Sequence, residues 1–150
     1  MTTTPGGVTS VATTIGLTEP LDARAVSEGL DQARVRWFDA NIATYRLTVA
    51  EILNFWSAGC TWIIVASEGV VTETKANRPE CPRVEWTVEQ LHEMVSGWID
   101  EVSEFASPEF GEHTLAVRFD DNGVPVTMEF DLANGVDEET SMRVTFRPLP

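Results

Sequence analysis

Hydrophobic residues recur along this chain with two different periods, and the two periods follow each other in the same order twice. Across residues 21–43 and 87–106 they recur every three or four positions, which is typical of one face of an amphipathic helix. Each helical segment is followed by three short stretches that alternate apolar and polar residues or are apolar throughout, as strands are. The pattern predicts an α+β fold of order αβββ-αβββ, in which an antiparallel sheet of about six strands carries two helices on one face.

The second half of the chain carries the clearer local signals. Thr87 and Gln90 have the spacing of a capping box, in which each side chain satisfies a free backbone N–H of the other residue at a helix start. Residues 120–123, Asp-Asp-Asn-Gly, are typical of a hairpin turn between two alternating strands. These two features predict where the second helix begins and where the hairpin after it turns.

The first half of the chain is less regular. The strand predicted at residues 44–50 runs into residues 53–60, a loop rich in aromatic residues. Phe55 and Trp56 in this loop either fold over an edge of the core or are displayed as anchors for a partner, since tryptophan is enriched in interface hot spots. We interpret them as a candidate partner surface. Residues 68–69, Glu-Gly, are predicted to form a two-residue turn between the next two strands.

The N-terminal segment shows no convincing period. Residues 1–19 include seven threonines and are predicted to form a disordered Thr/Gly-rich tail, with a single domain over residues 20–150. No signal peptide is visible, but tails of this kind often tether an exported domain, so a removed leader is one hypothesis. The longest apolar run, residues 62–66, is far shorter than the roughly 20 residues of a membrane helix, and the domain is not expected to insert into a membrane.

The charge of the chain limits its partners. The sequence has 24 acidic and 10 basic residues, a formal net charge of −14. Such a charge repels phosphate backbones and anionic lipids, so nucleic acid is not expected as a partner. Another protein is a candidate partner, and the simpler interpretation is that the charge only keeps the protein soluble.

Cys60 and Cys81 are the two cysteines of the chain. If residues 68–69 close a hairpin, Cys60 lies opposite a position only a few residues from Cys81. A disulfide between the two is therefore geometrically reasonable, and we predict it. Two buried free thiols are the alternative.

No catalytic arrangement is recognisable in the sequence. Neither His92 nor His113 has a nucleophile or an orienting carboxylate at a familiar spacing, so both are interpreted as ordinary surface or boundary histidines. A zinc site that joins them to the cysteines is disfavoured because the spacings match no usual ligand set. The acidic residues 137–139 lack the alternating ligands and the turn glycine of a calcium loop. No catalytic, cofactor-binding or metal-binding residue is predicted, and enzymatic activity is not favoured.

Several short segments follow one another in a recognisable order. They are Ala33-Arg-Val-Arg-Trp37 with Ile42-Ala-Thr-Tyr-Arg46, Gly69-Val-Val71, Thr87-Val-Glu-Gln-Leu91 with Val95, Phe119-Asp-Asp-Asn-Gly-Val-Pro125, Asp131, Asp137-Glu138 and Phe146-Arg-Pro148. Their order resembles a bacterial family of unknown function that occurs in exported proteins and lipoproteins. The chain departs from the family at Val124-Pro125, where an aromatic residue before the proline is usual. The resemblance implies an envelope or secreted location and supplies no activity.

These observations together predict a non-enzymatic, exported binding or interaction domain of the bacterial cell envelope. The alternative is a small hydrolase, or a small-ligand-binding domain with a pocket between helices and sheet. A concave cavity lined by convergent titratable side chains would favour this alternative.

Overall fold

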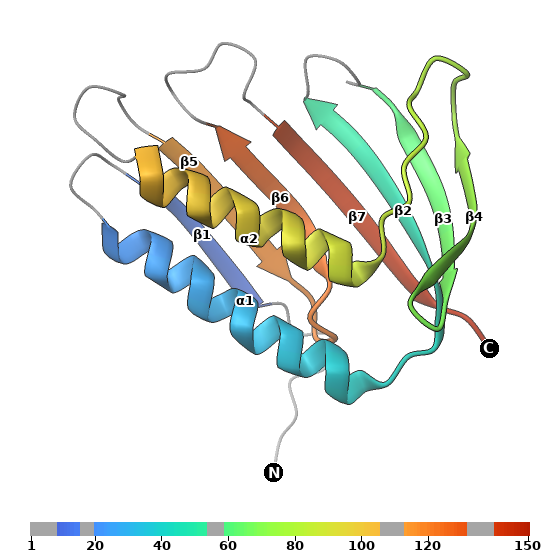
Figure 1. Ribbon diagram of the computed structural model, residues 1–150, viewed down its shortest axis with the longest axis horizontal. Coiled ribbons are helices and arrows are strands. Elements are labelled where there is room, and N and C mark those ends of the chain that lie inside the picture. The colour runs from blue at the N-terminus through green and yellow to red at the C-terminus, as the bar shows by residue number, and fades with distance from the viewer. Residues whose placement is uncertain (1–8, 16–19, 54–58, 106–112, 132–139) are drawn as a thin grey trace.

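Two helices lie side by side on one face of a seven-stranded antiparallel sheet (Figure 1). The computed structural model describes residues 9–15, 20–53, 59–105, 113–131 and 140–150. Along the chain the elements are β1 (Thr9–Ile15), α1 (Pro20–Ala40), β2 (Thr44–Leu53), β3 (Thr61–Ser67), β4 (Val70–Ala76), α2 (Val88–Phe105), β5 (His113–Phe119), β6 (Pro125–Asp131) and β7 (Thr140–Pro148). The strands lie in the order β1-β5-β6-β7-β2-β3-β4. From α1 to β7, the predicted α+β class and the order αβββ-αβββ are confirmed.

β1 is a strand that the sequence pattern does not predict. The prediction of a disordered tail over residues 1–19 is wrong for Thr9–Ile15. These residues form a strand that pairs with β5 from Thr9↔Phe119 to Ile15↔His113. Threonine, valine and isoleucine favour extended backbone, and β5 would otherwise be a sheet edge with unpaired backbone groups. Pairing with a distant strand therefore orders a segment whose composition allows a strand but does not specify one. Residues 1–8 and 16–19 lie outside the described part of the chain.

The core lies between the helices and the sheet. Its buried side chains come from both helices and from the helix-facing positions of the strands, among them Val26, Leu30, Ala33, Tyr45, Leu47, Val49, Leu91, Val95, Val102, Val117 and Met128. Phe38 is an exception to the pattern. Its apolar character predicts a place on the buried face of α1, but its side chain is 83% exposed. The buried face of α1 ends at Trp37, and the next position points about 100° away around the helix.

The predicted turn and cap are both present. Glu68 and Gly69 join β3 to β4, and both have positive φ, 54° and 77°, as a tight hairpin turn that follows the twist of the strands requires. At the start of α2, the Gln90 N–H donates to Thr87 Oγ1 over 3.2 Å, and the Thr87 N–H donates to Gln90 Oε1 over 3.0 Å. The capping box therefore begins α2 where the sequence predicts.

The predicted disulfide joins Cys60 and Cys81, whose Cα atoms are 5.9 Å apart, within the usual range. It fastens the segment between β4 and α2 to the start of β3. The same segment covers Trp62 of β3, because Trp62 Nε1 donates to the Pro82 carbonyl over 2.8 Å and its ring meets Trp86 edge to face at 5.3 Å. This connection therefore covers a part of the sheet that the helices leave open. In the described ranges, neither helix is long and apolar enough to cross a membrane.

Candidate functional site

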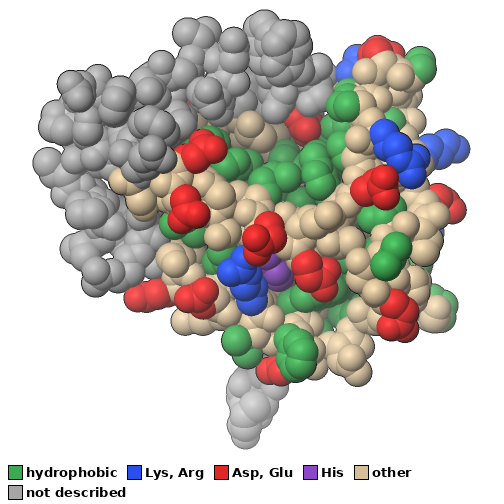
Figure 2. All heavy atoms as spheres, in the orientation of Figure 1, with side chains coloured by type: hydrophobic (Ala, Val, Ile, Leu, Met, Phe, Trp, Pro, Cys, Tyr) green, Lys and Arg blue, Asp and Glu red, His purple; other side chains and the backbone are tan. Residues whose placement is uncertain are grey.

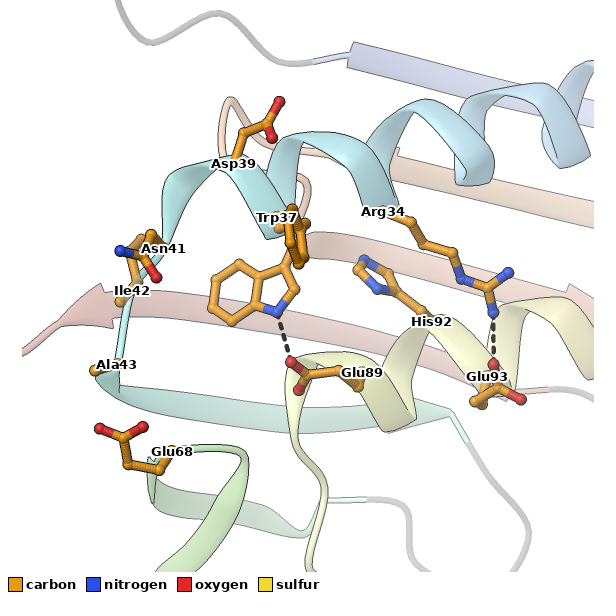
Figure 3. Close-up of a pocket in the computed structure, with 11 residues that line it drawn as sticks. Arg34, Trp37, Asp39, Asn41, Ile42, Ala43, Glu68, Glu89, His92 and Glu93 are labelled. Carbon is orange, nitrogen blue, oxygen red and sulfur yellow. Dashed lines mark hydrogen bonds and ion pairs between the residues drawn. The ribbon is translucent and has the colours of Figure 1, made fainter.

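A cleft of about 730 Å³ opens where the end of α1 meets the start of α2. Its other walls are the connection from α1 to β2 and the turn between β3 and β4 (Figure 3). The cleft is lined by four carboxylates, one guanidinium, one imidazole and two aromatic rings: Asp39, Glu68, Glu89, Glu93, Arg34, His92, Trp37 and Phe38. Phe55 and Trp56, proposed from the sequence as a partner surface, fall outside the described residues.

Helical periodicity gathers these side chains on two facing surfaces. Arg34 and Trp37 are three positions apart on α1, and Glu89, His92 and Glu93 are three and four positions apart on α2. Residues at these spacings lie on one side of a helix. The two helices contact each other, so the two sets meet across the cleft (Figure 3).

The α1–β2 connection and the β3–β4 turn close the cleft on its other side. Asn41, with φ 51°, donates its N–H to the Phe38 carbonyl over 3.2 Å, so a left-handed residue ends α1 and redirects the chain into β2. The Glu68 N–H donates to the Ala43 carbonyl over 2.9 Å. This bond ties the β3–β4 turn to the connection and brings the Glu68 carboxylate to the cleft.

Trp37 is held at the floor of the cleft. Its Nε1 donates to Glu89 Oε2 over 2.8 Å, and its ring meets Tyr45 and Phe146 edge to face at 5.2 and 5.7 Å. Beside it, Arg34 Nη2 donates to Glu93 Oε2 over 2.6 Å (Figure 3). Both partners of that ion pair are exposed, so water screens it and its contribution to stability is small. Both bonds join α1 to α2.

His92 lies behind the cleft, 2% exposed, and is not the surface or boundary histidine that the sequence predicts. Its Nε2 lies 2.7 Å from the Gly123 carbonyl oxygen, to which it can only donate. Burial lowers the pKa of His92 below its ordinary 6.5, and the nearby Arg34 charge lowers it further, while the Gly123 bond, Glu89 and Glu93 act in the opposite direction. His92 is therefore neutral at pH 7.

One signal in the sequence does place His92 inside the protein. It stands four residues after Val88 and three before Val95, both of which are fully buried. A residue at these spacings shares their face of the helix. The cluster of aromatic and acidic residues gives no comparable local signal, because its contacts between α1 and α2 join residues 52 and 59 positions apart.

The Gly123 carbonyl belongs to the β5–β6 turn, and this turn packs closely on α1. Asp120 Oδ1 accepts the N–H groups of Asn122 and Val124, both over 2.9 Å, and so shapes the turn. Burial raises the pKa of Asp120, while these two bonds lower it. At Gly123 the backbone has φ +82° and lies against the α1 backbone at Ala33 and Trp37. One turn therefore contacts both helices beside the cleft.

The cleft is strongly acidic. Four carboxylates against one guanidinium leave a net charge of −3 with His92 neutral. In the described part of the chain, Asp39 and Glu68 form no ion pair, since the three present there use other carboxylates. The exposed ring of Phe38 adds an apolar surface beside these charges.

The ionisable groups of the cleft are mainly carboxylates, which bind cations. The described residues that line the cleft include no Ser, Thr, Cys, Tyr or Lys. His92 Nε2 already bonds a backbone carbonyl. No group of three or more potential ligands for a metal ion is found within the described residues. The charge and the exposed ring are the properties that the cleft offers to a ligand.

Comparison with models of protein families, with curated proteins and with solved structures finds no match for this chain. The resemblance to a bacterial family of exported proteins stays a prediction from the sequence.

Proposed function

We propose that the protein is a non-enzymatic, extracytoplasmic binding domain that holds a lysine or arginine side chain of another protein in the cleft between α1 and α2. The observation that carries the proposal is the concentration of negative charge around an exposed aromatic ring in a concave site. A volume of about 730 Å³ lies in the usual range for ligand pockets and exceeds what one side chain occupies.

The chemistry of the lining selects for a cation. The Asp39 and Glu68 carboxylates, which form no ion pair with a described residue, attract positive charge from one side of the cleft, and the walls focus their field. The face of an aromatic ring such as that of Phe38 attracts a cation as well, by about 0.5–1 kcal/mol at an exposed site. An anionic ligand would meet four carboxylates and a single guanidinium that is already paired with Glu93.

The extracytoplasmic location rests on the disulfide between Cys60 and Cys81. Disulfides form and persist in oxidising compartments and are rare where thiols are kept reduced. The resemblance noted in the sequence supports the same location.

Isothermal titration of the protein with the peptide acetyl-(Gly-Arg)3-amide tests the proposal. The variant Asp39→Asn/Glu68→Gln removes two carboxylates that form no ion pair with a described residue, so the fold should persist. Exposed charge pairs contribute about 0.2–1 kcal/mol each, so this variant should bind the peptide about tenfold more weakly. Phe38→Ala should also weaken binding.

The matched control is Asp31→Asn/Asp100→Asn, which makes the same change of net charge at exposed helix positions outside the cleft. It should bind the peptide nearly as the unmodified protein does. Equal losses in the two double variants would mean that the peptide senses only the overall charge, and the proposal would then be wrong.

A further inference from the structure

The face of the sheet opposite the helices carries half of the basic residues of this acidic protein. Both helices lie on one face (Figure 1), and on the other face the side chains that alternate with the buried core positions are exposed or half-buried. Five of the ten basic residues stand at these positions: Arg46 on β2, Lys75 on β4, Arg118 on β5, and Arg143 and Arg147 on β7. We call this surface the basic face.

The strand register fixes how these five residues are arranged. Arg46 and Arg147 are direct cross-strand partners, and Arg118 and Arg143 both pair with Thr127 between them. From β5 to β4 the five residues extend over five strand spacings, about 24 Å. The basic residues therefore form a band across the sheet rather than isolated surface charges.

No basic residue of this band forms an ion pair with a described residue. The three ion pairs in the described part of the chain use Arg34, Arg78 and Arg83, none of which lies on the basic face. Like charges directly opposite each other, such as Arg46 and Arg147, destabilise a sheet. Three carboxylates, Glu73, Glu129 and Asp131, share the face, so its described residues carry +2 in a chain of −14.

The helix-bearing side has the opposite character. Acidic side chains are spread over it around the helices (Figure 2), including the exposed Glu28, Asp31, Asp39, Glu93, Asp100 and Glu101. The net charge of the whole chain disfavours anionic partners, but the local charge of the basic face has the opposite sign. An anion approaching the strands meets guanidinium groups first.

We propose that the basic face binds a linear polysaccharide that carries carboxylate or sulfate groups. Guanidinium groups bind such oxyanions through two parallel hydrogen bonds. The hydroxyls of Thr48, Thr127 and Thr145 lie between the arginines on the same face and can bond sugar hydroxyls. This proposal concerns a surface separate from the cleft and does not depend on the function proposed for it.

The shape and composition of the face favour this ligand over other polyanions. On the described strands the basic face has no aromatic side chain, so it lacks the stacking platform on which single-stranded nucleic acids bind. A bilayer is a broad anionic plane, and it would also meet the carboxylates of Glu73 and Glu129. A single linear chain is narrower than a bilayer and can run along Arg118, Arg143, Arg147 and Arg46, which face the same side of the sheet.

Heparin and polygalacturonate are suitable probes, and their affinity can be followed as a function of salt by biolayer interferometry. If five charges are neutralised, raising the salt from 50 to 200 mM should weaken binding about 100-fold, when the relation for single-stranded nucleic acids is applied to the polysaccharide. For Arg143→Gln/Arg147→Gln, with three charges left, the same change should weaken binding only about 20-fold. Thr145→Glu, which sets a carboxylate between these two arginines, should weaken binding at low salt while the fold persists.

The matched control is Arg78→Gln/Arg83→Gln, which removes the same charge outside the basic face and should keep the affinity and salt dependence of the unmodified protein. Asp39→Asn/Glu68→Gln should also keep polysaccharide binding, which separates this proposal from that for the cleft. Equal losses in the two arginine double variants would overturn the proposal, as would the absence of binding to both probes. Tighter binding to single-stranded DNA or to phosphatidylglycerol vesicles than to the polysaccharides would overturn it as well.

Discussion

Replacing Gly123 by alanine should separate the β5–β6 turn from α1 and destabilise the protein strongly. The position has φ +82°, where an L residue costs about 1–2 kcal/mol. A Cβ there would overlap the Ala33 carbonyl oxygen and lie 2.8 Å from the Ala33 carbonyl carbon and 3.1 Å from the Trp37 nitrogen. These are backbone atoms of a helix, so they cannot rotate away as a flexible side chain can.

The two costs can be added to give an expected magnitude. Forcing an extra carbon into a packed site costs about 1–3 kcal/mol, so Gly123→Ala should lower the free energy of unfolding by about 2–5 kcal/mol in total. That is a large share of the roughly 5–15 kcal/mol that a domain of this kind possesses. Movement of the turn would also weaken the bond from His92 to the Gly123 carbonyl, which adds to the loss.

Gly69 provides a matched control in the same chain. It has φ +77°, and no atom lies within 4 Å of the Cβ that alanine would add, so Gly69→Ala should cost only about 1–2 kcal/mol. Urea unfolding followed by circular dichroism at pH 7 measures both variants. If they lose the same stability to within about 0.5 kcal/mol, the close packing of the turn on α1 has no energetic consequence and the reasoning fails.

Two further predictions concern the pH dependence of stability. The pKa of His92 is lowered in the folded state, so stability should be complete above its ordinary value of 6.5 and be lost as the pH falls below it. His92→Gln keeps an N–H for the Gly123 carbonyl but does not titrate, and its free energy of unfolding should fall less between pH 7.5 and 5; equal slopes would contradict this. Burial raises the pKa of Tyr45 from 10.0 to about 12, so stability should fall as the pH rises above 10, by about 2 kcal/mol at pH 12. Tyr45→Phe should remove this alkaline loss, and an unchanged alkaline transition would show that another group causes it.

The parts of the fold that the sequence predicts are those set by neighbouring residues. The capping box at Thr87 and the Glu68-Gly69 turn each depend on residues within four positions, and the helices and six of the strands follow from local periodicity. β1 escapes prediction because its order comes from pairing with β5, about a hundred residues away along the chain. Local composition does not encode such a partner.

The cleft could not be predicted for a similar reason. It joins the ends of elements whose contacts, such as Trp37 with Glu89 and Arg34 with Glu93, span 52 and 59 residues. The exposure of Phe38 depends on where the buried face of α1 ends. The helical period alone fixes that end only to within one residue. The disulfide was predictable because the β3–β4 hairpin brings its two cysteines together locally.

Among the described residues, the separation of basic and acidic side chains across the sheet amounts to an electric dipole along the normal of the sheet. A dipole turns in the field of a charged surface before contact, so the molecule reaches an anionic surface with its strands forward and a cationic one with its helices forward. Salt screens the charges on both faces, so this orienting effect weakens as the ionic strength rises. The net charge of −14 sets how strongly copies repel one another, but it does not set which way each of them faces.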